Sequence, residues 1–153
     1  MTINEFLADY GSTTQHFKSW SNDYFLEVLD QGVIGDSFQR LVVIYLDKIP
    51  VMLGYSKCKL DNFIFTDILK NAGLIPIGVR LFAPESGISR VEADIGLIDF
   101  NDIENSKIKN YLFEAKYTQK IHYRSSSFVV LNQSMKLIEY VLPGLIEILA
   151  KKS

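Results

Sequence analysis

The stretch "FQRLVVIYLDKIPVMLGYSK", residues 38–57, decides the fold. It is rich in β-branched and aromatic residues, which are common in strands, and the sequence Asp47-Lys48-Ile49-Pro50 in its middle is typical of a turn. The stretch therefore predicts a strand over residues 36–46 and a second strand over 51–60. The two strands pair as a hairpin.

Arg40 stands at the head of the apolar run in this hairpin, directly before Leu41. Charged side chains are common on the solvated face of a sheet, so the ordinary interpretation is an exposed arginine. The alternative is that Arg40 points inward, toward an anion.

Glu139 raises the same question in the sequence "KLIEYVLP". In a strand it shares one face with Leu137 and Val141, both apolar. It is therefore either a solvated exception, a partner of Arg40, or an inward charge that needs a partner or a ligand, because an isolated buried carboxylate is costly.

The rest of the chain alternates between strand and helix signals. Short turns between strands favour an antiparallel sheet, so the predicted fold class is α+β, a single antiparallel sheet with peripheral helices. The remaining strands are expected at 25–34, 89–100, 117–131 and 135–143, with a turn at 132–134. Helices are expected at 2–9, with Thr2 and Glu5 as a capping box, from 61 or 62 to a C-cap at Gly73, and at 144–153. Residues 11–14 break the first helix, 74–84 form a tight turn into a short element, and 101–113 form a helix or a loop.

Composition limits the functional classes. The chain has 153 residues, 48% hydrophobic and 22% charged, with a net charge of −2, which predicts a single domain over residues 1–153. No basic block indicates nucleic acid or a membrane surface as a partner. One cysteine excludes an internal disulfide, and the acidic start of the chain is unlike a signal peptide, so we expect a cytoplasmic protein.

Cofactor motifs are missing from the sequence. It has no glycine-rich phosphate loop, and its two histidines have no cysteine partners at metal-ligand spacing. We therefore expect neither a cofactor nor a metal, and any chemistry would depend on charge, shape and hydrogen bonds.

Four segments in order resemble the chorismate pyruvate-lyase family, also called 4-hydroxybenzoate synthases. They are "GSTTQHF" (11–17), "RLVVIYLDKIPVMLGYS" (40–56), "AGLIPIGVRLF" (72–82) and "YRSSSFVVLNQSMKLIEYVLP" (123–143). No single segment is specific, and the evidence lies in their shared order and spacing. The resemblance implies a chorismate lyase-like fold and a monomer whose ligand is buried under flaps. It also implies a cofactor-independent carbon–oxygen lyase that converts chorismate to 4-hydroxybenzoate and pyruvate, a step toward quinone biosynthesis.

The resemblance also implies roles for five residues. Arg40 corresponds to the family's ligand-binding arginine and Glu139 to its active-site glutamate, so both are expected to be catalytic and to bind substrate. Thr13, Ile77 and Gly78 are expected to bind substrate mainly through backbone N–H groups.

Departures from the family pattern keep an alternative open. Tyr55 replaces a second arginine, and the doubled arginine of the late strand is reduced to Arg124 followed by Ser125. Arg80 and Arg124 are candidates for the missing positive charge, although solvated positions are the ordinary interpretation of both. The alternative function is a lyase-like protein for a related substrate such as isochorismate, or a non-catalytic domain that binds or senses an aromatic acid.

Overall fold

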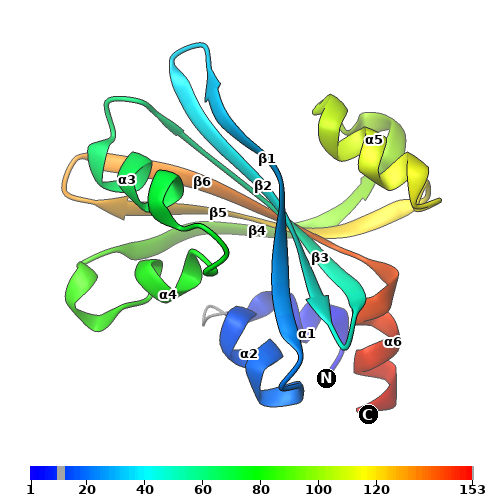
Figure 1. The fold of residues 1–153 in the computed structure, drawn as a ribbon. Coiled ribbons are helices and arrows are strands. Elements are labelled where there is room, and N and C mark those ends of the chain that lie inside the picture. Colours follow the sequence, from blue (N-terminus) through cyan, green and yellow to red (C-terminus); the bar gives the residue numbers. More distant parts are fainter. Residues whose placement is uncertain (10–12, 153) are drawn as a thin grey trace.

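One antiparallel sheet of six strands forms the centre of the molecule (Figure 1). The computed structural model describes residues 1–9 and 13–152, apart from the side chain of Glu92. The strands lie in the order β1-β2-β3-β6-β5-β4, so β1 and β4 form the edges. Their bounds are β1 Tyr24–Ile34, β2 Ser37–Leu46, β3 Ile49–Lys59, β4 Ser89–Asp99, β5 Lys120–Val130 and β6 Gln133–Val141. The predicted α+β class with a single antiparallel sheet is confirmed.

The helices lie around this sheet. They are α1 Ile3–Ala8, α2 Thr13–Trp20, α3 Phe63–Asn71, α4 Gly78–Leu81, α5 Ser106–Glu114 and α6 Pro143–Lys151, with 3-10 turns at Pro84–Ser86 and Phe100–Asp102. The capping box of α1 is confirmed, since the Glu5 amide donates to Thr2 Oγ1 at 3.1 Å and the Thr2 amide donates to Glu5 Oε2 at 3.0 Å. The C-cap of α3 is Ala72, one residue before the predicted Gly73, and Gly73 follows it in the left-handed conformation with a φ of +58°.

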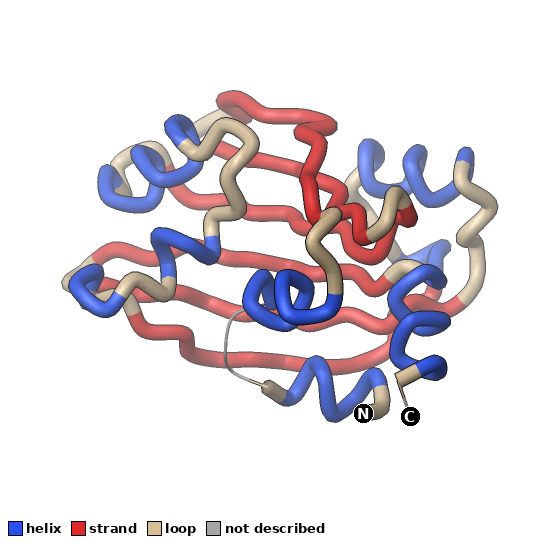
Figure 2. Tube along the Cα trace, turned by 60° about the horizontal axis from the view of Figure 1, so that its bottom comes forward, coloured by secondary structure: helices blue, strands red, loops and turns tan. Residues whose placement is uncertain are grey.

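Two groups of helices cover one face of the sheet, and α5 lies on the other (Figures 1 and 2). The helices α1, α2 and α6 pack on one end of the first face around Phe6, Phe17, Met52 and Leu145. The helices α3 and α4 pack on its other end around Phe65, Leu81 and Phe128. The middle of this face lies between the two groups of helices, and the pocket described below is found there.

The turn of the central hairpin is two residues shorter than the sequence predicts. Only Asp47 and Lys48 form the turn, with φ of 51° and 65°. Pro50 already belongs to β3, where it lies opposite Tyr45 at a break in the regular pairing. A proline is tolerated there because a bulge leaves a backbone position without a ladder hydrogen bond.

Two other turns differ from the prediction. The β5–β6 turn is formed by Leu131 and Asn132, and β6 begins at Gln133 rather than two residues later. Thr13 and Thr14 do not lie in a turn but begin α2, which the sequence analysis missed. The other two residues of that expected break, at positions 11 and 12, lie outside the described part of the chain.

Candidate functional site

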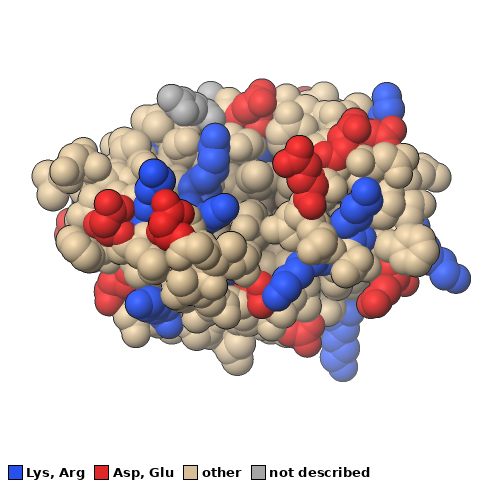
Figure 3. All heavy atoms as spheres, turned by 90° about the horizontal axis from the view of Figure 1, so that it is seen from above, with Lys and Arg blue, Asp and Glu red and all other residues tan. Residues whose placement is uncertain are grey.

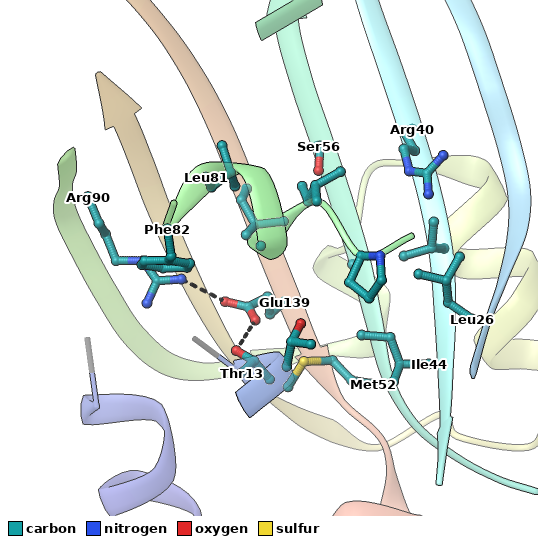
Figure 4. A pocket seen from close by; sticks show the side chains of 17 residues that line it. Thr13, Leu26, Arg40, Ile44, Met52, Ser56, Leu81, Phe82, Arg90 and Glu139 are labelled. Atoms are coloured by element: carbon teal, nitrogen blue, oxygen red, sulfur yellow. Dashed lines mark hydrogen bonds and ion pairs between the residues drawn. The ribbon is translucent and has the colours of Figure 1, made fainter. Parts of the chain in front are cut away.

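A pocket lies over the middle of the sheet, between the two groups of helices (Figure 4). It encloses about 600 Å³ of empty space, part of which is open to solvent. Its walls are largely apolar and come from α2, β1, β2, β3, β4, β6 and the segment around α4. The apolar lining consists of Leu26, Val42, Ile44, Met52, Pro76, Ile77, Leu81, Phe82 and Leu137.

All five residues to which the family resemblance assigns a role line this one pocket. Thr13 comes from the start of α2, Arg40 from β2, Glu139 from β6, and Ile77 and Gly78 from the beginning of α4. The fold therefore brings together residues that lie up to 126 positions apart in the chain. Their part in binding a ligand stays a prediction.

Arg40 points into the fold and is only 2% exposed. Its Nη1 donates to Gln31 Oε1 at 2.9 Å and its Nη2 donates to the Gly73 carbonyl at 2.7 Å. Both acceptors are neutral, and no carboxylate of the described residues forms an ion pair with Arg40. Burial lowers the pKa of this guanidinium. The solvent-face interpretation of Arg40 is therefore wrong, and the guanidinium lies in the pocket without a counter-ion from the described chain.

Glu139 is also buried, at 5% exposure, and its partner is Arg124 rather than Arg40. The two residues are directly opposite each other on β5 and β6. Nε and Nη2 of Arg124 each lie 2.8 Å from Glu139 Oε1. The hydroxyl of Thr13 donates to the other oxygen, Oε2, at 2.8 Å. The carboxylate is thus held in place from two sides.

Arg124 is enclosed behind the pocket and is 2% exposed, so its solvated interpretation is wrong. Besides its bonds to Glu139, it donates from Nη1 to the carbonyls of Leu7, at 3.0 Å, and Asp9, at 2.8 Å. Its Nη2 also donates to Thr13 Oγ1 at 2.7 Å. These bonds use every N–H of the guanidinium, which leaves none for a ligand. Arg124 instead joins the end of α1 and the start of α2 to the sheet.

Arg90, on β4, is a lining residue that the sequence analysis missed. Its guanidinium carbon lies 5.0 Å from the ring centres of Phe82 and Phe128, and its Nη2 lies 3.8 Å from Glu139 Oε1. Burial first, and then the charge of Arg124, lower the pKa of Arg90 to about 10. An arginine directly before an apolar residue at the start of a predicted strand is the same signal that pointed to Arg40.

Arg80 and Tyr55, the other two residues considered as replacements for the family's missing arginines, lie outside the pocket. Arg80 forms an exposed ion pair with Asp67, at 3.0 Å, between α4 and α3, as expected for a surface arginine. Tyr55 packs on the opposite face of the sheet, against the cluster around α5. Its hydroxyl therefore cannot replace the family's second arginine in this pocket.

Among the described residues, no group of three or more His, Cys, Asp and Glu side chains is placed to hold a metal ion. Within the same part of the chain, no helix has the length and apolar character needed to cross a membrane.

Comparison with known proteins places the fold. The sequence matches no protein-family model, and no curated protein matches it. Among solved structures, the chain is similar to the C-terminal domain of the histidine utilization repressor from Pseudomonas syringae pv. tomato, with 14% identity and a TM-score of 0.51 over 79% of this chain and 92% of that one. It is also similar to a ligand-binding domain from Bordetella bronchiseptica, described as part of a GntR-family transcriptional regulator, with 13% identity and a TM-score of 0.51 over 78% and 85% of the two chains.

These structures correct the expectation of an enzyme. They are domains of transcriptional regulators, so the prediction of a carbon–oxygen lyase is contradicted. The roles predicted for Arg40 and Glu139 are not tested by this comparison, and it lends no support to a place in quinone biosynthesis. The chain shares the α+β fold of these two regulator domains.

Proposed function

We propose that this chain is a non-catalytic domain that senses a small organic acid, and that Arg40 binds the carboxylate of that acid. The observation that carries the proposal is the buried guanidinium of Arg40, which faces the pocket with only neutral acceptors. A buried charge is costly unless it is paired, so an anion in the pocket would relieve an existing cost. Guanidinium and carboxylate groups also match in shape and form paired charge-assisted hydrogen bonds.

The two ends of the pocket favour different chemical groups. Arg40 on β2 and Glu139 on β6 lie on opposite sides of the pocket (Figure 4), and the intervening strand β3 contributes Gly54 and Ser56 to the lining between them. Glu139 Oε2 accepts one hydrogen bond, from Thr13, and a carboxylate oxygen has room for another. A ligand with a carboxylate at one end, an apolar or aromatic body and a hydroxyl donor at the other end fits both. A second carboxylate would meet the negative charge of Glu139.

The similar structures support sensing, since one of them is by its description a ligand-binding domain. In the same proposal the chain acts as one domain over residues 1–153, as a monomer in the cytoplasm, without touching nucleic acid or membrane. Figure 3 agrees for the face that it draws, where acidic and basic side chains are interspersed rather than gathered by sign.

Calorimetric titration with three related probes tests the proposal. 4-Hydroxybenzoate should bind at least ~10-fold more tightly than its neutral analogue 4-hydroxybenzamide, because the acid gains charge-assisted hydrogen bonds worth about 1.5–3 kcal/mol. Terephthalate, with a second carboxylate in place of the hydroxyl, should bind less tightly than 4-hydroxybenzoate. Equal affinity for the acid and the amide, or no binding of either, would contradict the proposal.

A further inference from the structure

The edge strand β1 contains an irregularity next to Arg40. Val28 lies opposite Val42 and Asp30 lies opposite Leu41, so Leu29 is an extra residue in the ladder. This is a β-bulge, in which two residues of one strand oppose one residue of its neighbour. Leu29 packs with the cluster around α5, on the face away from the pocket.

The bulge decides which side chain of β1 meets Arg40. Asp30 lies on the far face, where its Oδ1 is 2.8 Å from Lys107 Nζ and its Oδ2 accepts a hydrogen bond from Gln39 Nε2. Gln31 lies opposite Arg40 on the pocket face, and its Oε1 accepts a hydrogen bond from Arg40 Nη1 at 2.9 Å. A neutral amide, rather than a carboxylate, is therefore the side-chain partner of this guanidinium.

A regular strand would have given the opposite result. Side chains alternate between the two faces, so without the extra residue Val28 and Asp30 would both lie on the pocket face. A carboxylate next to Arg40 would then neutralise it, and a ligand anion would have to compete with the protein's own acid. Because the bulge shifts the register by one residue, Gln31 rather than Asp30 lies opposite Arg40, and no carboxylate of β1 competes with the ligand.

We propose that Gln31 is a positioning residue that determines the pocket's preference for anions: it orients the guanidinium of Arg40 without neutralising it. The ligand side of this inference rests on the proposed function, whereas the lack of a counter-ion for Arg40 does not. The position of Gln31 on the edge strand β1 is consistent with this role. Gln31 is exposed, so a carboxylate at the same position would keep part of its hydration and would pair with Arg40 at little cost.

The test compares Gln31→Glu with Gln31→Met, and uses Gln119→Glu as an exposed control with the same change of charge. At pH 7 and without ligand, Gln31→Glu should raise the unfolding midpoint by about 3 °C or more over the control, because Arg40 gains a counter-ion. The pairing lowers the pKa of the introduced carboxyl below its unfolded value of about 4.3. The gain should therefore be present above that pH and be lost as the pH falls further.

Binding gives the second readout, with 4-hydroxybenzoate as the probe. Gln31→Glu should weaken its binding at least ~10-fold, whereas Gln31→Met, which removes an acceptor but adds no charge, should stay within about 5-fold of the wild type. Unchanged binding by Gln31→Glu would overturn the proposal. If Gln31→Glu does not fold, a loss of binding by folded Gln31→Met as large as that of Arg40→Met would overturn it, since the amide would then do more than orient the guanidinium.

Measurements in the Arg40→Met background separate the role of the bulge from the proposed sensing function. In that background Gln31→Glu should no longer raise the unfolding midpoint, and a rise that persists there would overturn the inference. If the wild type binds no probe but the gain in stability still depends on Arg40, the sensing function fails while the role of the bulge stands.

Discussion

Arg124 and Glu139 face each other across β5 and β6, and two nitrogens of the arginine lie 2.8 Å from the same carboxylate oxygen. Both side chains of this ion pair are buried, and of the two only Glu139 lines the pocket. Arg40, two strands away, has no such partner among the described residues. At one end of the pocket, the carboxylate of Glu139 is paired with Arg124. At the other end, the guanidinium of Arg40 has only neutral partners among the described residues.

Replacing Arg124 should destabilise the fold more than it changes the pocket lining. Arg124→Met leaves Glu139 buried without its counter-ion and releases the carbonyls of Leu7 and Asp9. We expect a loss of about 3–5 kcal/mol in the free energy of unfolding, measured by urea denaturation. The double variant Arg124→Met/Glu139→Gln should recover part of this loss, because the unpaired charge is removed. A double variant as unstable as the sum of the two single ones would show that the pair does not interact as described.

Gly54 forms part of the pocket floor, between Val42 and Glu139 on the neighbouring strands. A Cβ added there would lie 3.4 Å from Val42 Cγ2, an acceptable contact, and would extend into the pocket. Gly54→Ala should therefore change the free energy of unfolding by less than about 1 kcal/mol, since alanine also reduces the entropy lost on folding. Its affinity for 4-hydroxybenzoate should nevertheless fall several-fold. Full affinity in a titration of the folded variant would place the ligand away from this floor.

Alkaline pH should weaken the fold through Tyr111, on α5. Burial, and then the neighbouring Tyr45 and Tyr117, raise the pKa of Tyr111 to about 12. The unfolded chain, with an ordinary pKa near 10, loses this proton earlier, so stability is complete below pH 10 and is lost as the pH rises toward 12. Urea unfolding at a series of pH values should show this fall, and Tyr111→Phe should reduce its slope. An identical slope in the variant would assign the effect to other groups.

Local signals in the sequence were sufficient for most of the sheet. β-Branched runs marked the strands, and the Thr2–Glu5 spacing marked the start of α1, because both depend on neighbouring residues. Helix α2 was missed because Thr13 and Thr14 follow a glycine and a serine, which together resemble a turn. Two of its inward side chains, Phe17 and Trp20, form too short a pattern to indicate a helix.

The site was only partly predictable. Arg40 and Glu139 stood out because each is a charge within an apolar strand, but their partners depend on strand register, which the sequence does not reveal. The bulge at Leu29 and the pairing of Glu139 with Arg124 both belong to this long-range information. The lyase interpretation was wrong for a different reason. It came from a resemblance in fold, and the same fold and pocket can serve either binding or catalysis.

The most direct test of the sensing function is a calorimetric titration of Arg40→Met with 4-hydroxybenzoate, beside the wild type and Arg80→Met. Arg80 is matched in charge but lies in an exposed ion pair outside the pocket lining. We predict that Arg40→Met binds at least ~10-fold more weakly than the wild type, while Arg80→Met binds as the wild type does. Folded Arg40→Met that retains wild-type affinity would contradict the account, because the anion would then be held somewhere else.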